Sequence, residues 1–245
     1  MIQTKMTLFS SRQLTKDVWE LAFTGDTEAF TRPGQFVNLE LDGLFLRRPI
    51  SVCDWEEDGT LTLSYRVVGK GTAQMSELLP GSEIDVLTAL GNGFNSGKDC
   101  RKPLLIGGGI GVAPLYKLAK EIAARGLRQT VICGFKNASE IFYRQEFEAI
   151  QGLTLIIATE DGSEGVKGFV TDAMKGLEFD YFYTCGPMPM LKALCKVCDA
   201  PGEASLEERM GCGFGICMGC TCKTMTGGKR ICKEGPVFNR EELVW

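Results

Sequence analysis

Four cysteines near the end of the chain restrict how that part of it can fold. Cys212 and Cys217 have four residues between them, Cys217 and Cys220 have two, and Cys232 follows after eleven more. Plant-type [2Fe–2S] proteins have this spacing, in which a tight loop supplies three thiolates and a separate segment supplies the fourth. The glycines of 211–217 let the backbone approach a cluster closely. The spacing therefore predicts Cys212, Cys217, Cys220 and Cys232 as ligands of a [2Fe–2S] cluster.

Structural zinc is the alternative for the same cysteines. Zinc ribbons usually contain two short cysteine pairs, whereas this segment has one pair with two intervening residues, and zinc leaves the glycine-rich loop unexplained. Cys222 is a fifth thiol here, and we expect it to be a neighbour of the cluster because its use as a ligand would break the spacing. Cys195 and Cys198, also separated by two residues, are expected to be packing residues on a helix.

Histidine is absent from the sequence, although eleven cysteines are present. The chain can therefore form no Ser-His-Asp triad, no Rieske centre, and no haem or zinc site that needs histidine ligands. Its formal net charge of −4 gives no basic surface for nucleic acid. No apolar run approaches the roughly 18 residues of a membrane span, and the N-terminus lacks the apolar core of a signal peptide. We expect a cytoplasmic protein that binds neither nucleic acid nor a membrane.

The 245 residues fall into three regions that differ in sequence pattern and composition. Residues 1–99 alternate apolar and polar side chains in short runs between turn formers, which predicts a small antiparallel β-barrel. Residues 100–201 alternate short apolar runs with helical patterns, such as 115–123 and 141–150, which predicts a parallel sheet. Residues 202–245 are rich in glycine and cysteine and too few to bury much of a core, so a bound metal centre would supply stability.

A glycine-rich loop follows the first predicted strand of the second region. It occupies 107–114 and opens a helix, so that Gly109 and Gly111 would let a phosphate approach the helix N-terminus. The match to G-x-G-x-x-G is imperfect because Pro114 stands where the third glycine should be, and a glycine turn without a ligand is the alternative. The second strand is followed by Phe-Lys-Asn at 135–137 rather than by an arginine cluster, which favours NAD over NADP.

One strand of the first region ends in residues that suit a flavin dinucleotide. Arg47 and Arg48 precede the Pro-Ile-Ser of 49–51. An arginine can pair with a diphosphate through two parallel hydrogen bonds, and a serine hydroxyl can hydrogen-bond a ring nitrogen of a flavin. Residues 69–72 offer a second loop of small residues for phosphate. Two arginines beside a proline are usually surface charge, so this motif gains its meaning from the rest of the chain.

Together these segments resemble the electron-transfer subunits of class 1B dihydroorotate dehydrogenases, which belong to the ferredoxin-reductase-like flavoproteins. The resemblance extends over the whole chain, and its motifs are specific in combination. They are the Arg-Pro-aliphatic-Ser strand at 48–51, the flavin strand at 64–66, the Gly-Thr pair at 71–72, the glycine loop at 107–114, the Cys-Gly-Pro-x-Pro-Met turn at 185–190 and the cysteine segments at 208–220 and 232–238.

The resemblance implies three cofactors, namely FAD, a [2Fe–2S] cluster and NAD. It divides the chain into an FAD-binding β-barrel domain at 1–99, an NAD-binding α/β domain at 100–201 and a cluster domain at 202–245. Cys185 would lie near the nicotinamide, and no residue is expected to act as a catalytic acid or base. The cofactor-binding residues that the resemblance implies are Arg48, Pro49, Ile50, Ser51, Ser64, Tyr65, Arg66, Gly71, Thr72, Gly109 and Gly111.

The resemblance also implies a partner, an FMN-containing dihydroorotate dehydrogenase catalytic subunit, in a heterotetramer with two copies of each chain. Electrons would pass from dihydroorotate to FMN, to this cluster, to FAD and to NAD+. The length of the chain supports a partner independently, because all three regions are committed to cofactors. Related subunits of electron-bifurcating NADH and NADP enzymes have an aspartate at the position of Cys212, which favours the dihydroorotate family here. Two competing hypotheses are a stand-alone NADH-dependent reductase of a different electron carrier and a non-catalytic redox sensor or zinc-stabilised binding module.

Overall fold

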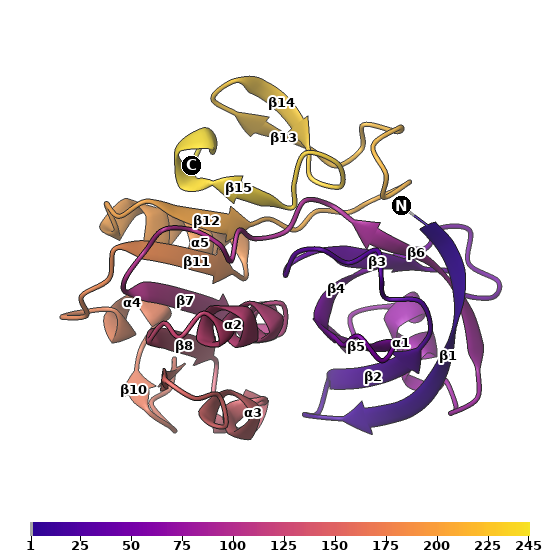
Figure 1. Ribbon diagram of the computed structural model, residues 1–245, viewed down its shortest axis with the longest axis horizontal. Coiled ribbons are helices and arrows are strands. Elements are labelled where there is room, and N and C mark those ends of the chain that lie inside the picture. The colour runs from indigo at the N-terminus through magenta and orange to yellow at the C-terminus, as the bar shows by residue number, and fades with distance from the viewer. Residues whose placement is uncertain (1) are drawn as a thin grey trace.

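The computed structural model describes residues 2–245. A closed barrel of six antiparallel strands lies beside a seven-stranded sheet, and the cysteine-rich end of the chain lies above both in the view of Figure 1. The predicted fold class is confirmed: an antiparallel β-barrel, an α/β domain built on a mainly parallel sheet, and a small C-terminal cysteine-rich region.

The barrel forms because its strands alternate apolar and polar residues. Leu21 and Phe23 of β2 and Leu61 and Leu63 of β5 are fully buried, while the residues between them are partly exposed. Around the barrel the strands follow the order β1-β2-β5-β4-β3-β6. The elements of this half are β1 (Ile2–Gln13), β2 (Val18–Thr24), β3 (Phe36–Leu39), β4 (Arg48–Trp55), β5 (Thr60–Arg66), α1 (Lys70–Ser76) and β6 (Glu83–Leu90).

The second half is a sheet with the strand order β10-β9-β8-β7-β11-β12-β15, in which neighbours are parallel except for β15 at the edge. Helices cover both of its faces, as the alternation of strands and helices predicts (Figure 1). The elements are β7 (Pro103–Gly108), η1 (Gly109–Val112), α2 (Leu115–Ala124), β8 (Gln129–Phe135), η2 (Ala138–Glu140), α3 (Arg144–Glu148), β9 (Leu153–Thr159), β10 (Val166–Lys167), α4 (Val170–Ala173), β11 (Tyr181–Cys185), α5 (Met188–Val197), β12 (Gly202–Ser205) and β15 (Val237–Asn239).

The helix predicted over 141–150 is shorter than expected. Ile141 is extended, and Tyr143 has a left-handed backbone with φ of 61°, so that α3 begins only at Arg144. The reason is tertiary packing, because Phe142 turns inward against Phe135 with ring centroids 5.6 Å apart. The helix predicted over 115–123 is confirmed as α2.

The cysteine-rich end is joined to the sheet at both of its ends. β12 extends the sheet beside β11, and β15 then pairs with β12. Between them lie the cysteine loop and a hairpin of β13 (Thr221–Thr224) and β14 (Gly227–Arg230), and η3 (Arg240–Glu242) follows β15. The division of the chain at 99/100 and 201/202 stays a prediction, but the sheet itself takes strands from both sides of residue 201.

Cys195 of α5 and Cys198, which directly follows this helix, are packing residues, as predicted. Cys195 and Cys198 are 6% and 4% exposed and belong to the apolar core between α4, α5 and the sheet. Within residues 2–245, none of the helices has the length and apolar character needed to cross a membrane.

Candidate cofactor site

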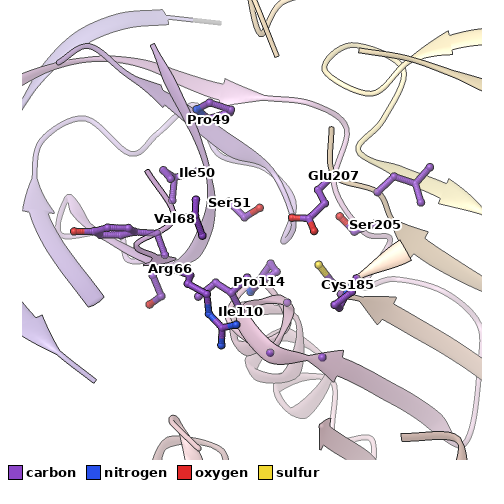
Figure 2. A pocket seen from close by; sticks show the side chains of 18 of the residues that line it. Pro49, Ile50, Ser51, Arg66, Val68, Ile110, Pro114, Cys185, Ser205 and Glu207 are labelled. Carbon is purple, nitrogen blue, oxygen red and sulfur yellow. The ribbon is translucent and has the colours of Figure 1, made fainter. Parts of the chain in front are cut away.

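A cavity of about 530 Å³ lies between the barrel and the carboxyl ends of the parallel strands. Ligands of α/β proteins bind at this edge of the sheet. Figure 2 shows residues of the barrel on one side of the cavity and residues of the sheet on the other. Its walls are formed by Pro49, Ile50, Ser51, Ser64, Tyr65, Arg66, Val68, Thr72, Gly108, Gly109, Ile110, Gly111, Pro114, Cys185, Gly186, Pro187, Ser205, Leu206 and Glu207.

The structure brings nine of the predicted cofactor residues into these walls and places the other two beside them. The two are Arg48 and Gly71, which contact each other at the start of α1. A Cβ added to Gly71 would lie 2.0 Å from Arg48 Nε, so that only glycine lets the guanidinium lie against this loop. A cationic fork held next to a small-residue loop fits a diphosphate.

Thr72 organises the loop from 68 to 72. Its hydroxyl oxygen accepts hydrogen bonds from Val68 N at 2.9 Å and from Gly69 N at 3.1 Å, and its hydroxyl donates to Gly69 O at 3.0 Å. The predicted Gly-Thr pair therefore shapes this side of the cavity by fixing the backbone before α1.

Arg66 spans the opening between the two halves. Its guanidinium pairs with Asp17 of the barrel at 3.2 Å and with Glu140, after β8, at 3.0 Å. A Cβ on Gly109 would lie 3.9 Å from Arg66 Nη2, so this charge reaches the glycine loop. Arg66 thus lies between the barrel and the glycine loop.

The glycine loop packs closely on the turn that contains Cys185. A Cβ added to Gly111 would lie 2.4 Å from Cys185 O, and one added to Gly108 would lie 2.4 Å from Met190 Sδ. Gly109 has φ of 53°, in the left-handed region. The two motifs that the sequence separates by more than seventy residues therefore form one surface. Burial raises the pKa of the Cys185 thiol to about 12, so it is a neutral contact group rather than a nucleophile.

Glu207 and Ser205 are site residues that the sequence reasoning missed. Figure 2 shows Glu207 and Ser51 pointing toward each other across the cavity, with Ser205 and Cys185 next to Glu207. Burial and then the neighbouring charge of Glu208 raise the pKa of Glu207. Both residues lie at the end of β12, a strand that the sequence did not predict. An acidic residue that follows a strand at the carboxyl edge of a parallel sheet would have been the signal.

The cysteine loop lies against the barrel next to the predicted flavin strand. Asn38 of β3, which pairs with Pro49 of β4, donates from Nδ2 to Cys212 O at 3.2 Å. Gly213 has φ of 78°, and a Cβ there would lie 2.5 Å from Asn38 Nδ2, so this approach requires glycine. The loop is thereby fixed one strand away from the residues that face the cavity.

Backbone N–H groups surround the sulfurs of the predicted ligands. Ile216 N donates to Cys212 Sγ at 3.3 Å, Gly219 N to Cys217 Sγ at 3.4 Å, and Cys232 N to Cys220 Sγ at 3.4 Å. Desolvation opposes ionisation of Cys212, but the backbone donors outweigh it and lower its pKa to about 6. Such donors stabilise thiolates and the sulfurs of a bound cluster.

The four thiols are arranged in two pairs. Cys212 contacts Cys217, and Cys232 contacts Cys220 and is close enough to Cys212 for their charges to interact. Within residues 2–245, no three cysteine or acidic side chains converge as ligands of one metal ion. Cys222 lies on β13, near Cys220. Two pairs of thiolates are what a two-iron cluster takes, since each iron binds two of the four cysteines.

Comparison with known proteins agrees with these assignments. Residues 207–244 match the iron–sulfur cluster binding domain of dihydroorotate dehydrogenase B, and residues 105–196 match the oxidoreductase NAD-binding domain. The chain is 44% identical to the dihydroorotate dehydrogenase B (NAD(+)) electron transfer subunit of Geobacillus sp. (strain WCH70), over 100% of this chain and 99% of that one. The chain belongs to this family of electron transfer subunits. The corresponding subunit of Fusobacterium nucleatum is also 44% identical, over 92% of each chain.

The fold is also similar to those of solved structures. A chain of the NADH-dependent reduced ferredoxin-NADP oxidoreductase, a flavin-based electron-bifurcating enzyme, superposes with a TM-score of 0.89 at 31% identity, over 98% of this subunit and 90% of that chain. The ferredoxin reductase of carbazole 1,9a-dioxygenase shares the fold, with a TM-score of 0.70 at 20% identity over 80% of this subunit and 64% of that chain. The 44% identity over the whole chain confirms the resemblance to dihydroorotate dehydrogenase electron transfer subunits.

Proposed function

We propose that the subunit holds FAD and NAD(H) in the cavity and a [2Fe–2S] cluster at Cys212, Cys217, Cys220 and Cys232. The observation that carries the proposal is that both dinucleotide motifs form one cavity, while the cysteine loop is attached to the strand beside it. Donor and acceptor groups for electrons would then be neighbours in a single rigid arrangement.

The residues around the cavity define what each would do. When bound, FAD links the one-electron chemistry of a cluster to the two-electron hydride chemistry of a nicotinamide. Arg48, lying on Gly71, binds the diphosphate, and the hydroxyl of Ser51 orients the flavin ring. The glycine loop and Arg66 bind the phosphates of NAD(H), and Cys185 supports the nicotinamide. The choice of NAD over NADP follows from the absence of an arginine cluster after β8 and from the names of the relatives.

The names of the relatives point to dihydroorotate oxidation as the source of the electrons. From the family resemblance we propose that this oxidation takes place in an FMN-containing catalytic subunit and belongs to pyrimidine biosynthesis. The two chains form a heterotetramer with two copies of each. We keep the cytoplasm as the predicted compartment, since the eleven cysteines are free thiols in the described residues.

The exposed edge of the cysteine loop is where the partner docks. Cys217 is exposed, and its neighbours Ile216 and Met218 are 76% and 53% exposed although both are apolar. Exposed apolar side chains beside a redox centre suit a protein contact. A partner seated here would lie directly against the cluster.

Spectroscopy of anaerobically purified protein tests the cofactors. The proposal expects flavin absorption bands together with iron–sulfur charge-transfer absorption, and equal amounts of iron and acid-labile sulfide. A protein with full flavin but with zinc or free thiols at the four cysteines would contradict it. A colourless protein would point to the sensor or zinc-stabilised binding module instead.

Co-purification tests the partner and its docking edge. We expect a dihydroorotate-oxidising flavoprotein to bind the wild-type subunit and to bind the Met218→Glu variant more weakly. Met225→Glu is the control, since Met225 is 70% exposed on the hairpin turn between β13 and β14. Unchanged binding of Met218→Glu would show that the docking edge is elsewhere, and equal loss in both variants would show that the loss is not specific to this edge.

A further inference from the structure

Tyr143 is a buried residue at the boundary of the two halves that the proposed function does not use. It stands between η2 and α3, is 5% exposed and stacks on Tyr116 of α2 with ring centroids 5.6 Å apart. Its backbone is left-handed, with φ of 61° and ψ of 16°. A bulky side chain rarely adopts this conformation, so the contacts of Tyr143 must compensate for it.

The hydroxyl of Tyr143 reaches across the boundary to three strands of the barrel. It lies 2.6 Å from Ser64 Oγ on β5 and 3.3 Å from Cys53 Sγ on β4, and it donates to the carboxylate of Glu20 on β2. Ser64 is also one of the residues in the cavity wall. A side chain of the nucleotide half is therefore hydrogen-bonded to a residue that faces the flavin side.

Counting protons fixes the direction of these hydrogen bonds. Glu20 is paired with Arg12 at 3.0 Å, so its carboxylate acts only as a hydrogen-bond acceptor. The single hydroxyl hydrogen of Tyr143 is therefore used in the hydrogen bond to Glu20. Cys53 keeps its proton, because burial raises its pKa, and it donates to Tyr143. Ser64 is then the donor in its hydrogen bond with the Tyr143 oxygen. Its remaining lone pairs make Ser64 an acceptor on the cavity side.

We propose that Tyr143 is a positioning residue: by accepting a hydrogen bond from the Ser64 hydroxyl, it leaves the Ser64 oxygen as an acceptor for an N–H group of the ring system bound in the cavity. The inference rests on the proposed function in assuming that this ring system is the flavin. Because Tyr143 and Ser64 belong to different halves, the acceptor is set only when the halves are docked. Docking of the nucleotide half thereby affects how the flavin is held.

The test compares Tyr143→Phe with Tyr116→Phe in the full chain. Both variants remove one hydroxyl from the same stacked pair, but only Tyr143 bonds to Ser64. We expect Tyr143→Phe to raise the dissociation constant for FAD about five- to tenfold, the effect of one hydrogen bond, and to shift the visible absorption bands of the bound flavin. Tyr116→Phe should change neither. Wild-type affinity and spectrum in Tyr143→Phe would overturn the proposal.

Ser64→Ala tests the same acceptor from the barrel side and replaces Tyr143→Phe if that variant fails to fold. Since Tyr143 acts through Ser64, the double variant should bind FAD no more weakly than Ser64→Ala alone. Additive losses would show that Tyr143 acts independently, and the inference would be wrong. If the wild-type chain binds no FAD, the proposed function fails; normal FAD binding with unaffected variants contradicts this inference alone.

Discussion

The cavity and the cysteine loop are built in opposite ways. The cavity is enclosed by long strands whose residues are packed in two apolar cores, one in the barrel and one in the sheet. The cysteine loop has short elements, an exposed edge and left-handed backbone at Gly213, Gly215 and Met218. The core beneath it includes two of the predicted ligands, Cys220 and Cys232.

The difference shows that the two sites owe their ordered structure to different interactions. The cavity is shaped by burial of apolar side chains, so its form does not depend on a ligand. The loop has short elements and an exposed edge, and a bound cluster would hold its four thiolates together. The effects of substitutions in the loop should therefore be confined to the loop. Substitutions in the cavity should change both the affinity for the cofactors and the stability of the fold.

Cys220→Ser gives the largest expected effect and the sharpest test of this separation. We expect the variant to lose its iron and electron transfer to the partner, but to keep FAD and NADH oxidation by artificial dyes. Iron content, flavin content and the two activities measure this. Cys222→Ser is the control and should keep its iron. Normal electron transfer from Cys220→Ser to the partner would disprove the order of the relay.

Arg48→Ala should weaken FAD binding roughly ten- to a hundredfold, the range for a hydrogen bond to a charged group. Iron content should not change, because Arg48 contacts Gly71 and Leu46 rather than the cysteine loop. Equilibrium dialysis of FAD measures the effect. Arg48→Lys keeps the positive charge but lacks the forked guanidinium, so its FAD affinity should lie between those of the wild type and Arg48→Ala. Unchanged FAD affinity in Arg48→Ala would contradict the role of Arg48.

Gly111→Ala should disturb the contact between the glycine loop and the Cys185 turn, since the new Cβ would lie 2.4 Å from Cys185 O. Overpacking of this kind costs about 1–3 kcal/mol in the free energy of unfolding, and the KM for NADH should rise. Urea denaturation and steady-state kinetics measure the two effects. Gly97→Ala is the control, because its new Cβ would meet Asn95 Oδ1 at 3.4 Å. If both variants behave alike, the close packing at Gly111 is unimportant.

Glu203→Gln gives the smallest expected effect, at the strand that joins the cysteine region to the sheet. Burial raises the pKa of Glu203, against the hydrogen bond from Asn95 N. A carboxyl group with a raised pKa stabilises the fold below its ordinary value near 4.5, and this contribution is lost as pH rises through the raised pKa. Thermal unfolding between pH 4 and pH 8 should show the variant gaining stability over the wild type as pH rises. A constant difference would contradict this assignment.

The sequence allowed most of the fold to be predicted because its local patterns agree with the tertiary structure. The alternation in β2 and β5, the helical spacing of α2 and the glycine loop after β7 all lie where predicted. The cysteine spacing identified four thiols that the structure brings together. In each case the sequence pattern that predicts an element lies within the residues of that element.

The remainder depends on contacts between distant segments. β12 and β15 have four and three residues, and they are strands only because they pair with the sheet and with each other. Glu207 follows β12 and was missed with it. The late start of the helix predicted over 141–150 has the same origin, since Tyr143, just before α3, is held by barrel strands that lie far away in the sequence.

The two strands that flank the cysteine loop have a consequence for protein engineering. Because β12 and β15 are the last two strands on one side of the nucleotide sheet, the iron–sulfur segment cannot be removed without disrupting that sheet. A truncation at residue 201 would expose the side of β11 to solvent and invite aggregation through the new edge. A chimera that exchanges redox centres between such subunits should therefore cut inside the loop, between Leu206 and Pro236, and leave both strands in place.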